Sequence, residues 1–234
     1  MEKKKNDFIA QGSILAIASI LVRVMGMIYR IPMTAIIGDK GNGFYSYAYS
    51  VYTILLLLSS YSLPLAVSKM VSAKAQLGQW RNVKRVFICA IAFAIGIGTT
   101  FGLIVLIGAQ FFTRVFFHSE LAAIALRFMA PTILIMALLG VFRGFFQGLQ
   151  NTLPTAVSQI VEGLINAIMS VVFAYFLFDF GHGMDAAGGT TDLGYAWGAA
   201  GGAIGTGAGA LAGLIFCFIL FVAYRKILAV NISR

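Results

Sequence analysis

Charged residues are scarce in this chain: only 11% of its 234 residues are Asp, Glu, Lys or Arg, against roughly 25% in a typical soluble domain. At the same time 60% of the residues are hydrophobic, and the mean hydropathy is +0.91. This shortage of charge excludes an ordinary soluble domain. The composition predicts an all-α membrane protein that crosses the bilayer several times.

Acidic residues are scarcer than basic ones, with 8 Asp and Glu against 17 Lys and Arg and a net charge of +9. In a soluble protein this excess would favour nucleic-acid binding. Here most basic residues flank apolar stretches, where they act as topology signals, so we expect no nucleic-acid partner. The two cysteines, Cys89 and Cys217, both lie in apolar stretches, which argues against paired disulfide use.

Signatures of catalysis and metal binding are missing as well. The sequence contains no nucleophile elbow, catalytic dyad or phosphate-binding loop, and His118 and His182 lie in joints without ligand-like partners. The stretch 205–210 formally fits the dinucleotide fingerprint G-x-G-x-x-A, but no strand precedes it and it lies in an apolar span. We therefore expect no enzyme, no metal and no cofactor.

Six apolar stretches are each long enough to cross a bilayer, which takes roughly 20 residues. Short joints with turn-forming residues separate them, for example 38–43 and 151–154. We expect residues 1–234 to form one lobe of six transmembrane helices. The predicted spans are 8–37, 44–67, 86–112, 121–149, 154–180 and 195–224.

Basic residues are divided unevenly between the two sets of joints. One set, with both tails, holds 12 Lys and Arg, and the other holds only Lys40 and Arg114. Because cytoplasmic joints carry the excess of Lys and Arg, both termini are predicted to be cytoplasmic. The basic joint 68–85 could form a short amphipathic helix on the inner leaflet, and the Gly-rich joint 181–194 is predicted to be mobile.

Two arginines, Arg23 and Arg30, lie inside the first apolar span. Each costs about 2.5–3.5 kcal/mol at the centre of a membrane helix on insertion scales. Seven residues apart, they lie on one face of a helix. The alternative is that one of them snorkels to an interface. The pair favours an anion site in a hydrated cavity, with both arginines binding substrate.

Polar side chains also form stripes on two other spans. Tyr45, Tyr49, Tyr52 and Ser59 share a face of the second span. The first two of these tyrosines favour an interfacial aromatic belt, whereas the deeper Tyr52 is a cavity candidate. The stripe on the fifth span, which predicts substrate-binding roles for its three central members, consists of Thr155, Gln159, Glu162, Asn166 and Ser170.

The acid Glu162 has two interpretations that the sequence leaves open. It could be the structural partner of an arginine such as Arg23 or Arg143, or it could couple transport to a proton or an ion. Arg143, near one end of the fourth span, is first an inner anchor and second a site residue, and the same applies to Gln147.

The sixth span carries a glycine every four residues, at Gly201, Gly205, Gly209 and Gly213. Such a ladder of small residues predicts close packing against another helix. In a single lobe, we expect this ladder and the polar stripes to be left facing lipid or a missing half.

Several stretches resemble polysaccharide-biosynthesis flippases. Residues 23–30 followed by Gly38 and 42–46 resemble the opening of these proteins, and 63–69 the end of their second helix. Residues 143–156 resemble their fourth-to-fifth helix joint and 197–203 the start of their sixth helix. The chain is most similar to the sporulation-protein-VB branch of the multidrug/oligosaccharidyl-lipid/polysaccharide exporter superfamily, which also contains the lipid II flippases.

This resemblance implies two six-helix lobes that move lipid-linked sugar precursors across a bacterial cell membrane by alternating access. It implies that Arg23 and Arg30 contact an anionic lipid-linked oligosaccharide, and that this chain is the N-terminal lobe. The missing C-terminal lobe or a second chain would be a partner, besides membrane lipids. The alternatives are a cation-coupled multidrug exporter and a non-transporting scaffold for cell-wall synthesis.

Overall fold

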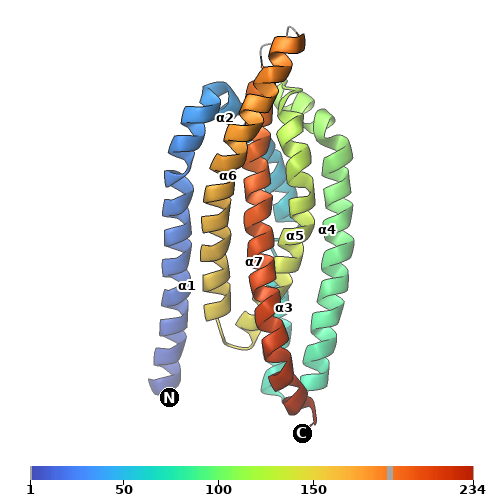
Figure 1. Cartoon of the computed structure of the whole chain (residues 1–234). Coiled ribbons are helices and arrows are strands. Elements are labelled where there is room, and N and C mark those ends of the chain that lie inside the picture. Colours follow the sequence, from blue (N-terminus) through green and yellow to red (C-terminus); the bar gives the residue numbers. More distant parts are fainter. Residues whose placement is uncertain (1, 189–191, 234) are drawn as a thin grey trace.

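The protein is a bundle of long α-helices, seen in a computed structural model that describes residues 2–188 and 192–233, with side chains from 12–186 and 192–224 (Figure 1). No strand occurs among these residues. The helices are α1 (Glu2–Ile28), α2 (Arg30–Ser60), α3 (Leu63–Gln76), α4 (Trp80–Phe117), α5 (Ala122–Gly148), α6 (Leu153–Gly188) and α7 (Leu193–Ser233).

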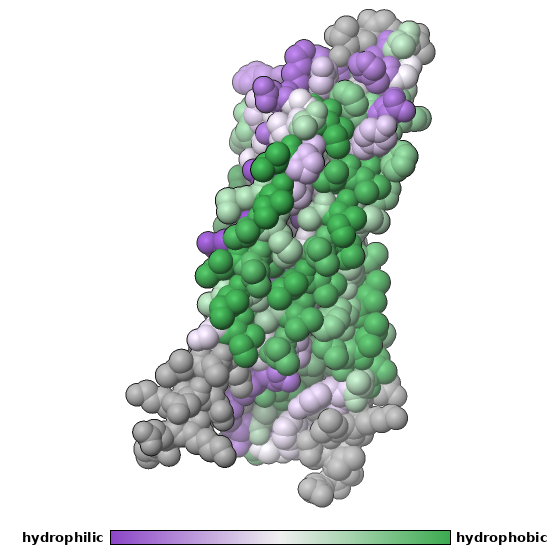
Figure 2. All heavy atoms as spheres, turned by 60° about the vertical axis from the view of Figure 1, so that its left-hand side comes forward, coloured by the Kyte–Doolittle hydropathy of each residue, from purple (hydrophilic) through white to green (hydrophobic). Residues whose placement is uncertain are grey.

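The bundle has the dimensions and the surface of a membrane protein. In the described part of the chain, five segments are long and apolar enough to span a bilayer, and α1 adds a shorter apolar stretch, Gly12–Ile28. Figure 2 shows a continuous apolar band around the middle of one face, with polar residues gathered at both ends. The prediction of an all-α membrane protein is therefore confirmed.

The first predicted span, 8–37, is one continuous helix, which consists of α1, Tyr29 and the start of α2. Tyr29 has right-handed helical φ and ψ values, its N–H donates to Met25 O at 3.1 Å, and its carbonyl accepts from Met33 N–H at 3.2 Å. The helix breaks only at Gly38, where φ is +62° and ψ is −177°. The joint 38–43 is thus shorter than predicted, because residues 39–43 are already helical.

The predicted surface helix at 68–85 is wrong. Residues 68–76 complete α3, residues 80–85 begin α4, and only 77–79 separate the two helices. A Cβ on Gly144 or Gly148 of α5 would lie within 3 Å of α3 atoms. This close packing on α5 makes α3 part of the bundle rather than a surface helix.

The Gly-rich joint predicted at 181–194 is shorter than predicted, because α6 continues through Gly188. The carboxylate of Asp185 accepts hydrogen bonds from Leu193 N–H at 3.0 Å and Gly194 N–H at 2.9 Å, which caps the start of α7. Lys40 Nζ contacts Asp192 Oδ1 at 2.9 Å and ties α2 to the same turn. Residues 181–188 are therefore helical rather than part of a joint, their mobility stays a prediction, and residues 189–191 lie outside the described part.

The glycine ladder of α7 packs against α6 within this bundle. A Cβ on Gly209 would lie 2.6 Å from Glu162 O and 2.8 Å from Asn166 Cβ, and one on Gly205 would collide with the backbone of Ser170. Glycine is therefore needed for the two helices to approach this closely. Close packing is confirmed, and the expectation that the ladder faces lipid or a missing half is wrong.

The core has two apolar clusters that both include α5. One lies among α2, α4, α5, α6 and α7 and contains Tyr45, Tyr52 and Met129. The other brings α3, α4, α5 and α7 together around stacked rings, with Phe87 and Phe221 at 4.6 Å between centroids.

The two ends of the chain emerge at the same end of the bundle, which also holds the α3–α4 turn (Figure 1). This arrangement agrees with an even number of crossings. The basic residues of the joint 68–85 therefore lie at the same end as the termini. That this end is cytoplasmic stays a prediction from the distribution of charge.

Candidate functional site

A cavity of about 410 Å³ lies between α1, α2, α5, α6 and α7. The residues that line it are far apart in the sequence. They come from α1 and α2 on two sides of the cavity and from α6 and α7 between them. Five of the predicted site residues line it: Arg23, Arg30, Tyr52, Glu162 and Asn166.

Arg23 and Arg30 supply positive charge to this cavity. Both side chains are exposed, and neither guanidinium makes a hydrogen bond or an ion pair within the described part of the chain. Free guanidinium groups at such a site are suited to bind carboxylate or phosphate oxygens, two N–H donors at a time.

Glu162 is the acidic residue of the cavity wall, and it is paired with Arg143. Arg143 Nη2 lies 2.7 Å from Glu162 Oε2, and Arg143 Nε donates to Ser158 Oγ at 2.9 Å. The two side chains are 11% and 25% exposed. Arg143 balances the charge of Glu162, and Arg23 and Arg30 therefore give the cavity a net positive charge.

Gln147 and Gln159 are not among the residues that line the cavity. Gln147 Nε2 lies 3.5 Å from Thr155 Oγ1, a distance at the limit for a hydrogen bond, at the α5–α6 end of the bundle. Gln159 Oε1 is buried without a hydrogen-bond partner among the described residues. Arg143 of α5 does not line the cavity either, but it contacts the cavity through its ion pair with Glu162.

Other cavity residues were not predicted as site residues. Tyr45 and Tyr49 line the cavity beside Tyr52, and the prediction of an interfacial belt is wrong for Tyr45, which is buried. Their spacing of four and three residues was the signal that could have assigned them. Thr206 of α7 also lines the cavity, but as a threonine beside ladder glycines it carried no comparable signal.

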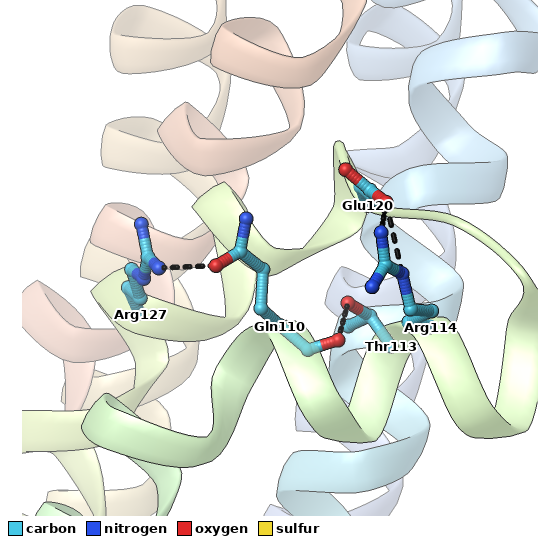
Figure 3. Close-up of polar contacts among 5 residues, drawn as sticks. All are labelled: Gln110, Thr113, Arg114, Glu120 and Arg127. Carbon is cyan, nitrogen blue, oxygen red and sulfur yellow. Dashed lines mark hydrogen bonds and ion pairs between the residues drawn. The ribbon is translucent and has the colours of Figure 1, made fainter.

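A second polar cluster lies away from the cavity, at the α4–α5 turn (Figure 3). Arg114 pairs with Glu120, with Nε donating to Oε1 at 2.9 Å, while Arg127 Nη2 lies 3.4 Å from Gln110 Oε1. None of these residues lines the cavity. The cluster holds the ends of α4 and α5 together. Arg114 and Arg127 are therefore arginines that lie outside the cavity.

The fold and the cavity define a helical multi-pass membrane protein with a positively charged site between its helices. The chain belongs to the polysaccharide biosynthesis protein family, whose model matches residues 8–233.

Two relatives come from Bacillus subtilis (strain 168). The chain is 26% identical to stage V sporulation protein B over 228 residues, which are 97% of this chain and 41% of that protein. It is 27% identical to lipid II flippase MurJ over 163 residues, which are 66% of this chain and 30% of that protein. The chain thus spans less than half the length of these relatives. No solved structure matches it.

Proposed function

We propose that this chain is the N-terminal six-helix lobe of a flippase for lipid-linked oligosaccharides in a bacterial cell membrane. In this proposal a second lobe, on the same or another chain, closes the cavity and rocks against this bundle in alternating access. The relatives and the family support this class of function, and one of the relatives is named as a lipid II flippase.

The single observation that carries the proposal is the charge of the cavity. Arg23 and Arg30 have no ion-pair partner among the described residues, whereas Glu162 is held by Arg143 at 2.7 Å. An undecaprenyl pyrophosphate head group is strongly anionic, and two guanidinium groups would bind its phosphate oxygens through charge-assisted hydrogen bonds. A surrounding of low dielectric constant strengthens such bonds.

A cation-coupled drug exporter is less well supported by the same geometry. Such an exporter needs a carboxylate that is free to bind a cation, and the acid that lines this cavity is already paired. The free arginines would also repel a cationic drug. A coupling role for Glu162 would require the pair with Arg143 to open during the transport cycle.

Binding of the pyrophosphate lipid to the chain in lipid nanodiscs tests the proposal. We expect Arg23→Gln and Arg30→Gln each to weaken binding of undecaprenyl pyrophosphate about tenfold or more, because a hydrogen bond to a charged group contributes about 1.5–3 kcal/mol. Arg127→Gln is the matched control, since Arg127 is an exposed arginine outside the cavity. Equal binding by all four proteins would contradict the proposal.

A further inference from the structure

Three tyrosines form one wall of the cavity. Tyr45, Tyr49 and Tyr52 lie on one face of α2 after the kink at Gly38, and all three line the cavity. The ring centroids of Tyr45 and Tyr49 are 5.8 Å apart with an interplanar angle of 20°, and those of Tyr49 and Tyr52 are 5.9 Å apart at 43°. We call this set the tyrosine wall.

The three rings of the tyrosine wall differ in exposure. Tyr45 and Tyr52 are 2% and 3% exposed and belong to the core, whereas Tyr49 is 39% exposed. The hydroxyl of Tyr45 lies 3.3 Å from Thr206 Oγ1 of α7, which holds that end of the wall in place. Two buried rings therefore support a middle ring whose surface is open to a ligand.

Neutral hydrogen-bonding groups stand beside the tyrosine wall. Asn166 of α6 and Thr206 of α7 both line the cavity. Asn166 Oδ1 accepts a hydrogen bond from Ser170 Oγ at 2.8 Å, which fixes the amide, and its NH2 group has no partner among the described residues. The cavity thus has two chemically different parts: guanidinium groups on the first membrane helix, and an aromatic surface with neutral polar groups.

We infer that the tyrosine wall is a sugar subsite, in which one face of a pyranose ring stacks on Tyr49. A pyranose has an apolar C–H face, which matches an aromatic ring, and hydroxyl groups around its edge, which match Asn166 and Thr206. This inference rests on the proposed function, because the pyrophosphate on Arg23 and Arg30 brings the attached sugar to the wall.

Other occupants fit this wall less well. An isoprenoid chain is apolar on all sides, and covering Asn166 with it would bury an amide NH2 group that has no partner among the described residues, at a cost in free energy. A cationic aromatic ligand would stack on Tyr49 but would be repelled by the free guanidinium groups of Arg23 and Arg30. A sugar satisfies both the ring and the polar groups.

The test compares two lipids on the same chain in nanodiscs: undecaprenyl pyrophosphate, and undecaprenyl pyrophosphate that carries a single hexose. We expect the sugar-bearing lipid to bind about three- to tenfold more tightly, the range for an aromatic contact. Tyr49→Ala should remove this preference, because it should lower the affinity for the sugar-bearing lipid more than the affinity for the sugar-free lipid. Tyr49→Phe should keep it, because the ring face remains.

Tyr47→Ala is the matched control. Tyr47 lies two residues away on the same helix, is 37% exposed, and stacks on Phe117 at 4.7 Å outside the cavity. We expect this variant to keep the preference for the sugar-bearing lipid.

The outcomes separate the two proposals. Equal binding of both lipids by the unmodified chain, or a Tyr49→Ala variant that loses affinity for both lipids alike, would overturn the sugar subsite and leave the proposed function standing. If neither lipid binds better than an uncharged polyprenol, the proposed function itself fails, and the sugar subsite fails with it.

Discussion

Arg143 of α5 and Glu162 of α6 form an ion pair across the wall of the cavity, with Nη2 and Oε2 2.7 Å apart. They are separated by 19 residues in the sequence and meet because the turn 149–152 brings α6 back along α5. The pair holds Glu162 in place. Arg23 and Arg30 are then the charged residues of the cavity that have no ion-pair partner among the described residues. The charge of the site thus depends on a residue, Arg143, that does not line it.

Breaking this pair should destabilise the protein. Arg143→Met leaves Glu162 without its cation, and we expect a loss of about 1–3 kcal/mol, below the full penalty for a deeply buried pair because both side chains are partly exposed. The double variant Arg143→Met with Glu162→Gln should recover part of the loss. Thermal unfolding in detergent, evaluated as a double-mutant cycle, measures the coupling. Strictly additive effects would show that the pair contributes nothing.

The glycine ladder of α7 should tolerate no added methyl group at Gly205. Gly205→Ala would push a Cβ into the backbone of Ser170 on α6, so we expect a loss of about 1–3 kcal/mol from overpacking. Gly96→Ala on α4 is the control, because its Cβ would meet no atom within 4 Å. The control should be neutral or slightly stabilising, by up to about 1 kcal/mol from helix propensity. Equal thermal stability of the two variants would show that α6 and α7 are not in this close contact.

The break at Gly38 depends on a backbone conformation that other residues rarely adopt. Its φ of +62° with ψ of −177° lies in a region used almost only by glycine, so Gly38→Ala should cost about 1–3 kcal/mol. Gly43→Ala, five residues further on, is the control, because it is helical and its Cβ would meet no atom within 4 Å. Thermal unfolding compares them, and a Gly38→Ala variant as stable as Gly43→Ala would contradict the kinked geometry.

The orientation of the bundle can be tested by labelling in cells. In a variant without Cys89 and Cys217, single cysteines at Asp39 and Ser119 should react with an impermeant thiol reagent added outside. A cysteine at Gln79 should react only after the membrane is opened. Asp39 follows the break at Gly38, Gln79 lies in the α3–α4 turn, and both are exposed. The α3–α4 turn lies at the end of the bundle that holds both termini (Figure 1). Asp185 is unsuitable, because its carboxylate caps α7. The reverse labelling pattern would overturn the prediction that both termini are cytoplasmic.

Much of the fold follows from the sequence because apolar length and the position of charges are local properties. The last four predicted spans agree with α4 to α7, and the first span ends at the break at Gly38. The second span, 44–67, is divided between α2 and α3, which are separated at residues 61 and 62. The prediction of a surface helix at 68–85 was wrong because it was based on the basic residues and not on the apolar face of α3. This face consists of Leu63, Val67 and Val71 and is buried against α5. Basic residues occur both on helices that lie on the membrane surface and at the ends of helices that span it, so the sequence alone does not distinguish the two.

The site was predictable where polar residues recur on one helix face. Spacing alone placed Arg23 and Arg30 together, and the same argument identified Glu162 and Asn166. Spacing could not show which arginine pairs with Glu162, because that depends on how α5 packs against α6. It also could not separate a tyrosine wall from an interfacial belt, because both place tyrosines on one helix face and the sequence does not show that Tyr45 and Tyr52 are buried.

Transbilayer movement of a lipid-linked oligosaccharide tests the central claim, the binding of its phosphates by Arg23 and Arg30, most directly. The measurement uses proteoliposomes that hold this chain with a matching second lobe. Proteoliposomes with this chain alone should show no movement, because alternating access needs two lobes. We expect Arg23→Ala and Arg30→Ala each to lower the rate about tenfold or more at equal insertion, and lysine at either position to restore it only in part, because it lacks the two-pronged guanidinium. Alanine variants that insert normally and move the lipid at the parental rate would contradict the account.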